Sequence, residues 1–168
     1  MKRVLFKVSI GVSMFIPLLA GNAFAGDVVA VKTIGMELAR DIANEAVMIC
    51  RKKGYQVSAV VVDRNGLVRA ALRDDLAPRF TLQIAEEKAN ATVMAGIGSG
   101  EFRKNRGDIR PELNHVDGVI MLAGALPISA GGYNIGAIGV SGAPGGDIDE
   151  DCAKKARAKF EERLEFAD

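Results

Sequence analysis

The chain has 168 residues, of which 22 are basic and 21 acidic, so its net charge is +1 at pH 7 with its single histidine neutral. This balance, without a basic block or an alternation of basic and aromatic residues, argues against nucleic acid as a partner. Hydrophobic residues make up 49% of the chain, and a chain of this length suits one domain with a single core.

The first 25 residues predict a secretory signal peptide. Residues 1–3 are a short basic start, residues 4–20 are mostly apolar, and Ala23-Phe24-Ala25 is a small-x-small cleavage site. We expect cleavage after Ala25, a periplasmic or secreted location, and a single mature domain of residues 26–168. That domain keeps 19 of the basic residues and all 21 acidic ones. No later segment is apolar over enough residues to cross a bilayer, so no membrane contact is expected after cleavage.

Two cysteines, Cys50 and Cys152, belong to the mature domain. In an oxidising compartment they can close a disulfide, or they can be two small buried apolar residues. The sequence does not give their separation, so both alternatives stay open. A metal site built from these two cysteines is disfavoured because His115 is the only histidine.

The first half of the chain predicts a helix, a β-hairpin and a second helix. Apolar residues recur at three- and four-residue steps over residues 29–53, which is typical of an amphipathic helix. Asn65-Gly66 between the β-rich runs 57–63 and 67–73 is a strong hairpin signal. The first run is continuously apolar, as in a central strand, and the charged second run is expected nearer an edge. A second helix begins at Pro78 and has a face of small residues.

The second half predicts a short helical turn, three strands and a last helix. The turn falls in residues 101–111, the strands at 119–123, 126–130 and 135–140, and the helix at 148–166. Gly136 and Gly139 inside the last strand indicate that another part of the chain approaches its backbone closely. Asp147 and Glu150 have the spacing of a capping box at the start of the last helix.

The element order is therefore α-β-β-α-(α)-β-β-β-α. It predicts an α+β fold with a five-stranded, mainly antiparallel sheet flanked by helices. The terminal helices are expected on one face of the sheet and the middle helix on the other.

Motifs for hydrolysis and phosphate binding are missing from the chain. Ser141 lacks the Gly-x-Ser-x-Gly pattern of a nucleophile elbow, and the glycine-rich residues 142–146 lack the Gly-Lys-Ser/Thr of a phosphate loop. No catalytic residue is therefore assigned.

Several side chains could nevertheless serve a ligand. His115 lies in a predicted loop and could ligate iron or transfer a proton, although a lone loop histidine is more often an exposed polar residue. Methionines such as Met94 could act as soft axial ligands or simply fill the core. Arg79 and Arg103 could pair with carboxylates such as propionates, or belong to a solvated basic surface.

A set of motifs resembles a known family. The chain from Val29 to Phe166 resembles the GlcG/HbpS-like proteins, which are haem-binding or haem-degrading domain proteins. The resemblance rests on Val61-Val62-Asp63-x-x-Gly66, Ile84-Ala85-x-x-Lys88-Ala89-x-Ala91-Thr92, Gly124-Ala125-Leu126-Pro127-Ile128, Ile135-Gly136-Ala137-Ile138-Gly139-Val140-Ser141-Gly142-Ala143 and Asp147-x-Asp149-Glu150-x-Cys152-Ala153.

The resemblance implies a profilin-like fold, self-assembly into dimers or larger rings, and binding of haem. Two departures bear on this: family sequences usually read Gly-Gly-x-Pro-Ile where this chain has Ala125 in second place, and the first helix lacks a histidine that some members are thought to use for haem iron. Ligation would then fall to His115, Thr92, a methionine such as Met94 or a partner subunit. We place Lys88 in the same site.

The leading hypothesis is an exported, oligomeric binding protein for haem or a related tetrapyrrole, with Arg79 or Arg103 near its propionates. One alternative is an enzyme that acts on a small metabolite or degrades haem. Another is a ligand-free accessory protein of a periplasmic oxidoreductase system.

Overall fold

The structure is a computed structural model and describes residues 29–166. The predicted signal peptide and its cleavage site lie outside the described residues. Within 29–166, no helix is long and apolar enough to cross a membrane.

The fold is α+β, with one antiparallel sheet in the order β2-β1-β4-β3. All six residues of β1 are buried, whereas β2 lies at an edge and is mostly exposed. Both expectations for the first hairpin are therefore confirmed. The strands are β1 (Ser58–Asp63), β2 (Val68–Arg73), β3 (Ala125–Ala130) and β4 (Tyr133–Ser141).

The described part of the sheet has four strands, so the prediction of a fifth at residues 119–123 is wrong. Instead of joining a strand, this segment binds a helix: the Ile120 amide donates to the Glu87 carbonyl at 3.3 Å. Met121 is buried in a small separate cluster with Ala91 and Phe102. The residues of this segment are apolar because they pack against helices. A short apolar run does not distinguish such packing from burial in a sheet. The profilin-like arrangement implied by the resemblance stays a prediction.

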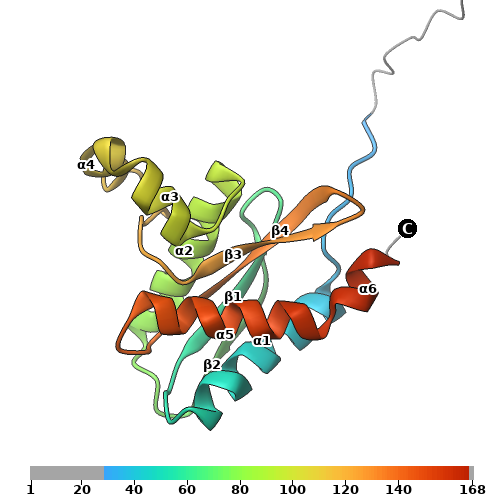
Figure 1. The fold of residues 1–168 in the computed structure, drawn as a ribbon, viewed down its shortest axis with the longest axis horizontal. Helices are drawn as coiled ribbons and strands as arrows, with labels where there is room; N and C mark the ends of the chain where they lie inside the picture. Colours follow the sequence, from blue (N-terminus) through green and yellow to red (C-terminus); the bar gives the residue numbers. More distant parts are fainter. Residues whose placement is uncertain (1–28, 167–168) are drawn as a thin grey trace, which may run out of the picture. The chain divides into compact units, whose positions relative to one another are not determined.

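Helices cover both faces of the sheet, as expected. Figure 1 shows α1 and α5 side by side on one face and α2 on the other, and the element contacts agree. A short 3₁₀ turn at Gly107–Ile109 lies between α3 and α4. The helices are α1 (Met36–Lys52), α2 (Phe80–Ala95), α3 (Ser99–Asn105), α4 (Arg110–Leu113), α5 (Gly146–Lys159) and α6 (Glu161–Glu165).

Helix ends differ from the prediction at both ends of the domain. α1 begins at Met36 rather than Val29, because the chain before it runs extended and the Ile34 amide donates to the Ile135 carbonyl at 3.0 Å. The last helix is broken at Phe160, whose φ of −111° leaves the helical range. The capping box at Asp147 is wrong, since α5 starts after Gly145 without a side-chain cap.

The two glycines in β4 mark close approaches, as predicted. A Cβ at Gly139 would overlap the Ala85 carbonyl oxygen, so the backbone of α2 lies directly on β4 there. At Gly136 a Cβ would overlap the Val62 carbonyl oxygen of the neighbouring strand. Glycine at position 139 lets α2 pack closer to the sheet than any side chain would permit, and glycine at position 136 leaves room for the neighbouring strand.

The largest core cluster lies between the sheet and the pair α1 and α5. Cys50 of α1 and Cys152 of α5 form a disulfide in this cluster, with a Cα–Cα distance of 5.7 Å and no exposed surface at either residue. This answers the open question about the two cysteines.

Reducing this disulfide should destabilise the fold strongly. The bridge joins residues 102 apart in sequence, and closing a loop of that length stabilises a protein by about 4–5 kcal/mol in the chain-entropy model. We expect urea unfolding of the protein with a reductant to show a loss of this order. A Cys50→Ala/Cys152→Ala double variant is the control, because its unfolding should not respond to the reductant. Equal stability of the oxidised and reduced protein would contradict the prediction.

Candidate functional site

A small hollow lies on the side of the sheet that α2 covers, and its volume is about 150 Å³. We call it the Thr92 hollow. The C-terminal part of α2, the β1–β2 turn and the β3–β4 hairpin contribute its lining, which consists of Arg64, Thr92, Val93, Pro127, Asn134 and Gly136.

The Thr92 hydroxyl is the unusual group of this hollow. Thr92 is only 1% exposed, and its Oγ1 has no hydrogen-bond partner among residues 29–166. A buried polar group without a partner costs roughly 1–3 kcal/mol, so such groups are rare and call for an explanation. A hydroxyl offers one donor and two acceptor lone pairs. It can therefore serve a bound ligand either as a hydrogen-bonding group or as an oxygen ligand.

Arg64 reaches the hollow from the β1–β2 turn, which Asp63 holds in place. Asp63 is 1% exposed, and its carboxylate accepts hydrogen bonds from the backbone amides of Asn65 at 2.8 Å and Leu67 at 3.0 Å. Its other oxygen accepts from Arg69, at 2.9 Å from Nη2. Burial by itself raises the pKa of the Asp63 carboxyl, but these donors more than offset it, and the pKa lies below its ordinary value.

The polar groups of the hollow are mainly donors. Ser129 Oγ donates to Asn134 Oδ1 at 2.6 Å, which leaves the Asn134 Nδ2 hydrogens unused within the described chain. Arg64 has no ion-pair partner there either. With the Thr92 hydroxyl, these groups suit a ligand that carries acceptor oxygens, such as a carboxylate.

Lys88, one turn before Thr92 on α2, is occupied elsewhere. Its Nζ donates to Asp149 Oδ2 at 2.9 Å and to the Val140 carbonyl at 3.0 Å, and both side chains of the pair are under 5% exposed. Asp149 also accepts from the Ala143 amide at 3.0 Å. Burial raises the pKa of Asp149, and the Lys88 ammonium opposes this shift.

The other residues expected at the site are spread over the surface. Met94 is 49% exposed at the same end of α2 as Thr92. Arg79 lies at the opposite end, 4.1 Å over the Phe80 ring. Thr92 follows Arg79 by 13 positions, which corresponds to about 20 Å along the helix axis. Arg79 does not line the Thr92 hollow.

Arg103 on α3 and His115 after α4 are both exposed and do not line the hollow. The described residues hold no group of three or more His, Cys, Asp or Glu side chains that could bind a metal ion. Of the residues expected at the site, only Thr92 lines the hollow within one copy of the chain.

Sequence reasoning missed Arg64 and Asn134. The sequence predicts the β1–β2 turn only as a hairpin turn, whereas the structure places Arg64, which has no ion-pair partner among residues 29–166, at the hollow. Asn134 gave no local signal, because its place beside Thr92 depends on how α2 crosses the sheet.

The family is shown by comparison with known proteins. A family model described as "Haem degrading protein HbpS-like" matches residues 34–158. The chain therefore belongs to the HbpS-like family of α+β proteins. No match was found among curated proteins.

Solved structures agree with this assignment. The crystal structure of HbpS is 36% identical, with a TM-score of 0.76 over 82% of this chain and 97% of that one. A double mutant of Streptomyces reticuli HbpS is 35% identical, with a TM-score of 0.76 over 82% of this chain and 94% of that one. The Klebsiella pneumoniae protein ORFY is 25% identical, with a TM-score of 0.74 over 81% and 96% of the two chains.

Removing the Thr92 hydroxyl should not destabilise the fold. Thr92→Val replaces an unpartnered buried hydroxyl by a methyl group of similar size, so we expect stability to stay level or rise by about 1 kcal/mol. The matched control on the same helix is Thr81→Val. Its hydroxyl contacts Ser58 Oγ and donates to the Pro78 carbonyl, both at 2.7 Å. The control should lose about 1–2 kcal/mol. Urea unfolding checks this, and equal losses in both variants would contradict it.

Asp63 should make the stability depend on acid pH. Its pKa is lowered in the folded state, so its contribution is complete above the ordinary value of 3.8 and is lost as the pH falls from there through the lowered value. We expect Asp63→Asn to cost about 1–3 kcal/mol near neutral pH and less in acid. Urea unfolding of both proteins near neutral pH and in acid measures this difference in stability. Exposed Asp117, which makes no hydrogen bond or ion pair within the described chain, gives the control Asp117→Asn. A loss of the same size at both pH values would count against the assignment.

Proposed function

We propose that the protein is exported and binds haem or a related tetrapyrrole as an oligomer. The observation that carries the proposal is the buried Thr92 hydroxyl, which has no partner among residues 29–166, in a hollow where Arg64 and Asn134 offer N–H donors. A protein that bound nothing there would gain stability by placing an apolar side chain at this position.

The names of relatives support haem as the class of ligand. The description of the matching family names haem degradation. A crystal structure of a PduOC:heme complex shares the fold, with a TM-score of 0.66 at 22% identity over 75% of this chain and 94% of that one. These names concern the relatives, and we extend haem binding from them to this chain.

The size of the hollow supports an oligomeric site. Pockets that enclose a small-molecule ligand usually measure about 300–1,000 Å³, whereas the Thr92 hollow measures about 150 Å³. A tetrapyrrole would therefore lie across its mouth and leave one face uncovered. Met94 at 49% and Tyr133 at 62% exposure are large side chains at this end of α2 and at the start of β4. We propose that a second copy of the chain covers the ligand over such surfaces.

Each residue then has a distinct role. Thr92 would offer its hydroxyl to the ligand, and Arg64 and Asn134 would donate hydrogen bonds to its carboxylates. His115 and Met94, both exposed, are free to reach a ligand held between subunits. Bound haem would supply redox chemistry that no side chain of this hollow supplies.

Haem degradation is the second candidate, because the matching family is described by that activity. Binding and degradation differ in their spectra. With ascorbate in air, a binding protein keeps its Soret band, whereas a degrading enzyme loses it and releases iron.

A haem titration combined with light scattering tests the proposal. We expect a shifted Soret band that saturates, a particle larger than one chain, and binding at least tenfold weaker in Thr92→Val and in Arg64→Gln. Lys52→Gln on α1, across the sheet, is the charge-matched control and should bind as the unchanged protein does. Absence of a saturable Soret shift would overturn haem binding, and a monomer that binds haem fully would overturn the shared site.

A further inference from the structure

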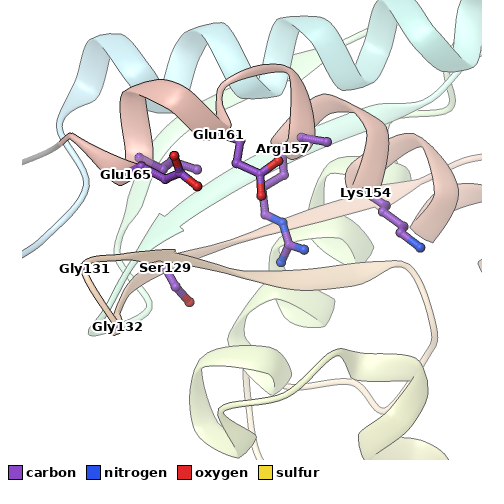
Figure 2. Close-up of a pocket in the computed structure, with 9 residues that line it drawn as sticks. Ser129, Gly131, Gly132, Lys154, Arg157, Glu161 and Glu165 are labelled. Carbon is purple, nitrogen blue, oxygen red and sulfur yellow. The ribbon is translucent and has the colours of Figure 1, made fainter.

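A larger cavity lies on the other side of the sheet, between α5, α6 and the turn that joins β3 to β4. Its volume is about 580 Å³, within the usual range for small-molecule sites of about 300–1,000 Å³. We call it the α5–α6 cavity (Figure 2). It shares no lining residue with the Thr92 hollow.

Four charged side chains follow one another along this cavity. Lys154 and Arg157 lie three residues apart on α5, Glu161 and Glu165 lie four apart on α6, and all four line the cavity. Figure 2 shows Lys154 at the α5 end, Glu165 at the α6 end, and Arg157 and Glu161 between them. The cavity is therefore positive along α5 and negative along α6.

The two cations of the cavity differ from the other cations of α5 and α6. Lys155 pairs with Asp151 at 2.8 Å, Lys159 with Glu45 at 2.7 Å and Arg163 with Asp41 at 2.8 Å. Lys154 and Arg157 have no ion-pair partner within residues 29–166, even though Glu161 and Glu165 line the same cavity. Both carboxylates are likewise unpaired there. Opposite charges thus face one cavity without neutralising each other.

Arg157 is also held in a defined position. Its Nη1 donates to the Pro127 carbonyl at 2.7 Å, and the side chain is partly buried. A neutral carbonyl partner fixes the guanidinium without cancelling its charge. The remaining N–H groups are free to bind a carboxylate, for which the planar guanidinium is well suited.

We propose that the α5–α6 cavity binds a small zwitterion, namely a free amino acid or a short peptide. The carboxylate of the ligand meets Arg157 and Lys154, and its ammonium group meets Glu161 and Glu165. A ligand with charges of one sign, such as a tetrapyrrole with two propionates, would face repulsion at one end of the cavity. The site is thus separate from the proposed haem site in both position and charge.

Blocked peptides test the proposal directly. Alanine, dialanine and trialanine are titrated into the purified protein by calorimetry, together with N-acetylated trialanine and trialanine amide. We expect at least one unblocked compound to bind, and each blocked form of trialanine to bind at least tenfold more weakly than free trialanine. No saturable binding of any unblocked compound, or equal binding of blocked and free trialanine, would overturn the proposal.

Two substitutions assign the ends of the ligand. Arg157→Gln should remove the difference in affinity between free trialanine and trialanine amide. Glu161→Gln should remove the difference in affinity between free trialanine and its N-acetyl form. The controls Lys155→Gln and Glu162→Gln change the same charges on α5 and α6 at residues that do not line the cavity, and should preserve both differences in affinity. Equal effects of Arg157→Gln and Lys155→Gln would refute the assignment. A haem titration of Glu161→Gln, a residue with no contact to the Thr92 hollow, should match the unchanged protein, so failure of the haem proposal is distinguishable from failure of this one.

Discussion

The buried ion pair between Lys88 and Asp149 fixes how the helices on the two faces of the sheet are placed. Lys88 reaches from α2 past the end of β4 to the first turn of α5, and it also binds the Val140 carbonyl. Such a pair need not add net stability, because removing both charges from water costs several kcal/mol per ion, but leaving one partner alone costs about 3–5 kcal/mol. Its effect is therefore on register: α2 and α5 cannot slide along the sheet without exposing or separating the two charges.

Both candidate sites depend on that register. Thr92 lies one turn after Lys88 on α2, and Lys154 and Arg157 lie one and two turns after Asp149 on α5. The contact of Gly139 with the α2 backbone sets the distance between α2 and the sheet, while the ion pair sets the position of α2 along the sheet. On the α5 face, the Cys50–Cys152 disulfide joins α5 to α1.

The sequence predicted correctly those features of the fold that depend on neighbouring residues alone. The Asn65-Gly66 turn, the buried first strand and the edge position of the second follow from patterns within a few residues. The failures involve distant partners. Residues 119–123 bind α2 rather than a strand, and α5 begins without the side-chain cap expected from Asp147. Arg64 and Asn134 lie beside Thr92 only because the two hairpins and α2 come together in the fold. The residues next to them in the sequence do not indicate this arrangement.

The β3–β4 hairpin connects the two candidate sites physically. Pro127 lines the Thr92 hollow, and its carbonyl holds Arg157 in the α5–α6 cavity. Ser129 lines the cavity and donates to Asn134, which lines the hollow. A ligand that moves Arg157 or Ser129 therefore acts on groups that shape the other site. Any such coupling must be reciprocal, because a ligand that changes the affinity of one site by some factor has its own affinity changed by the same factor.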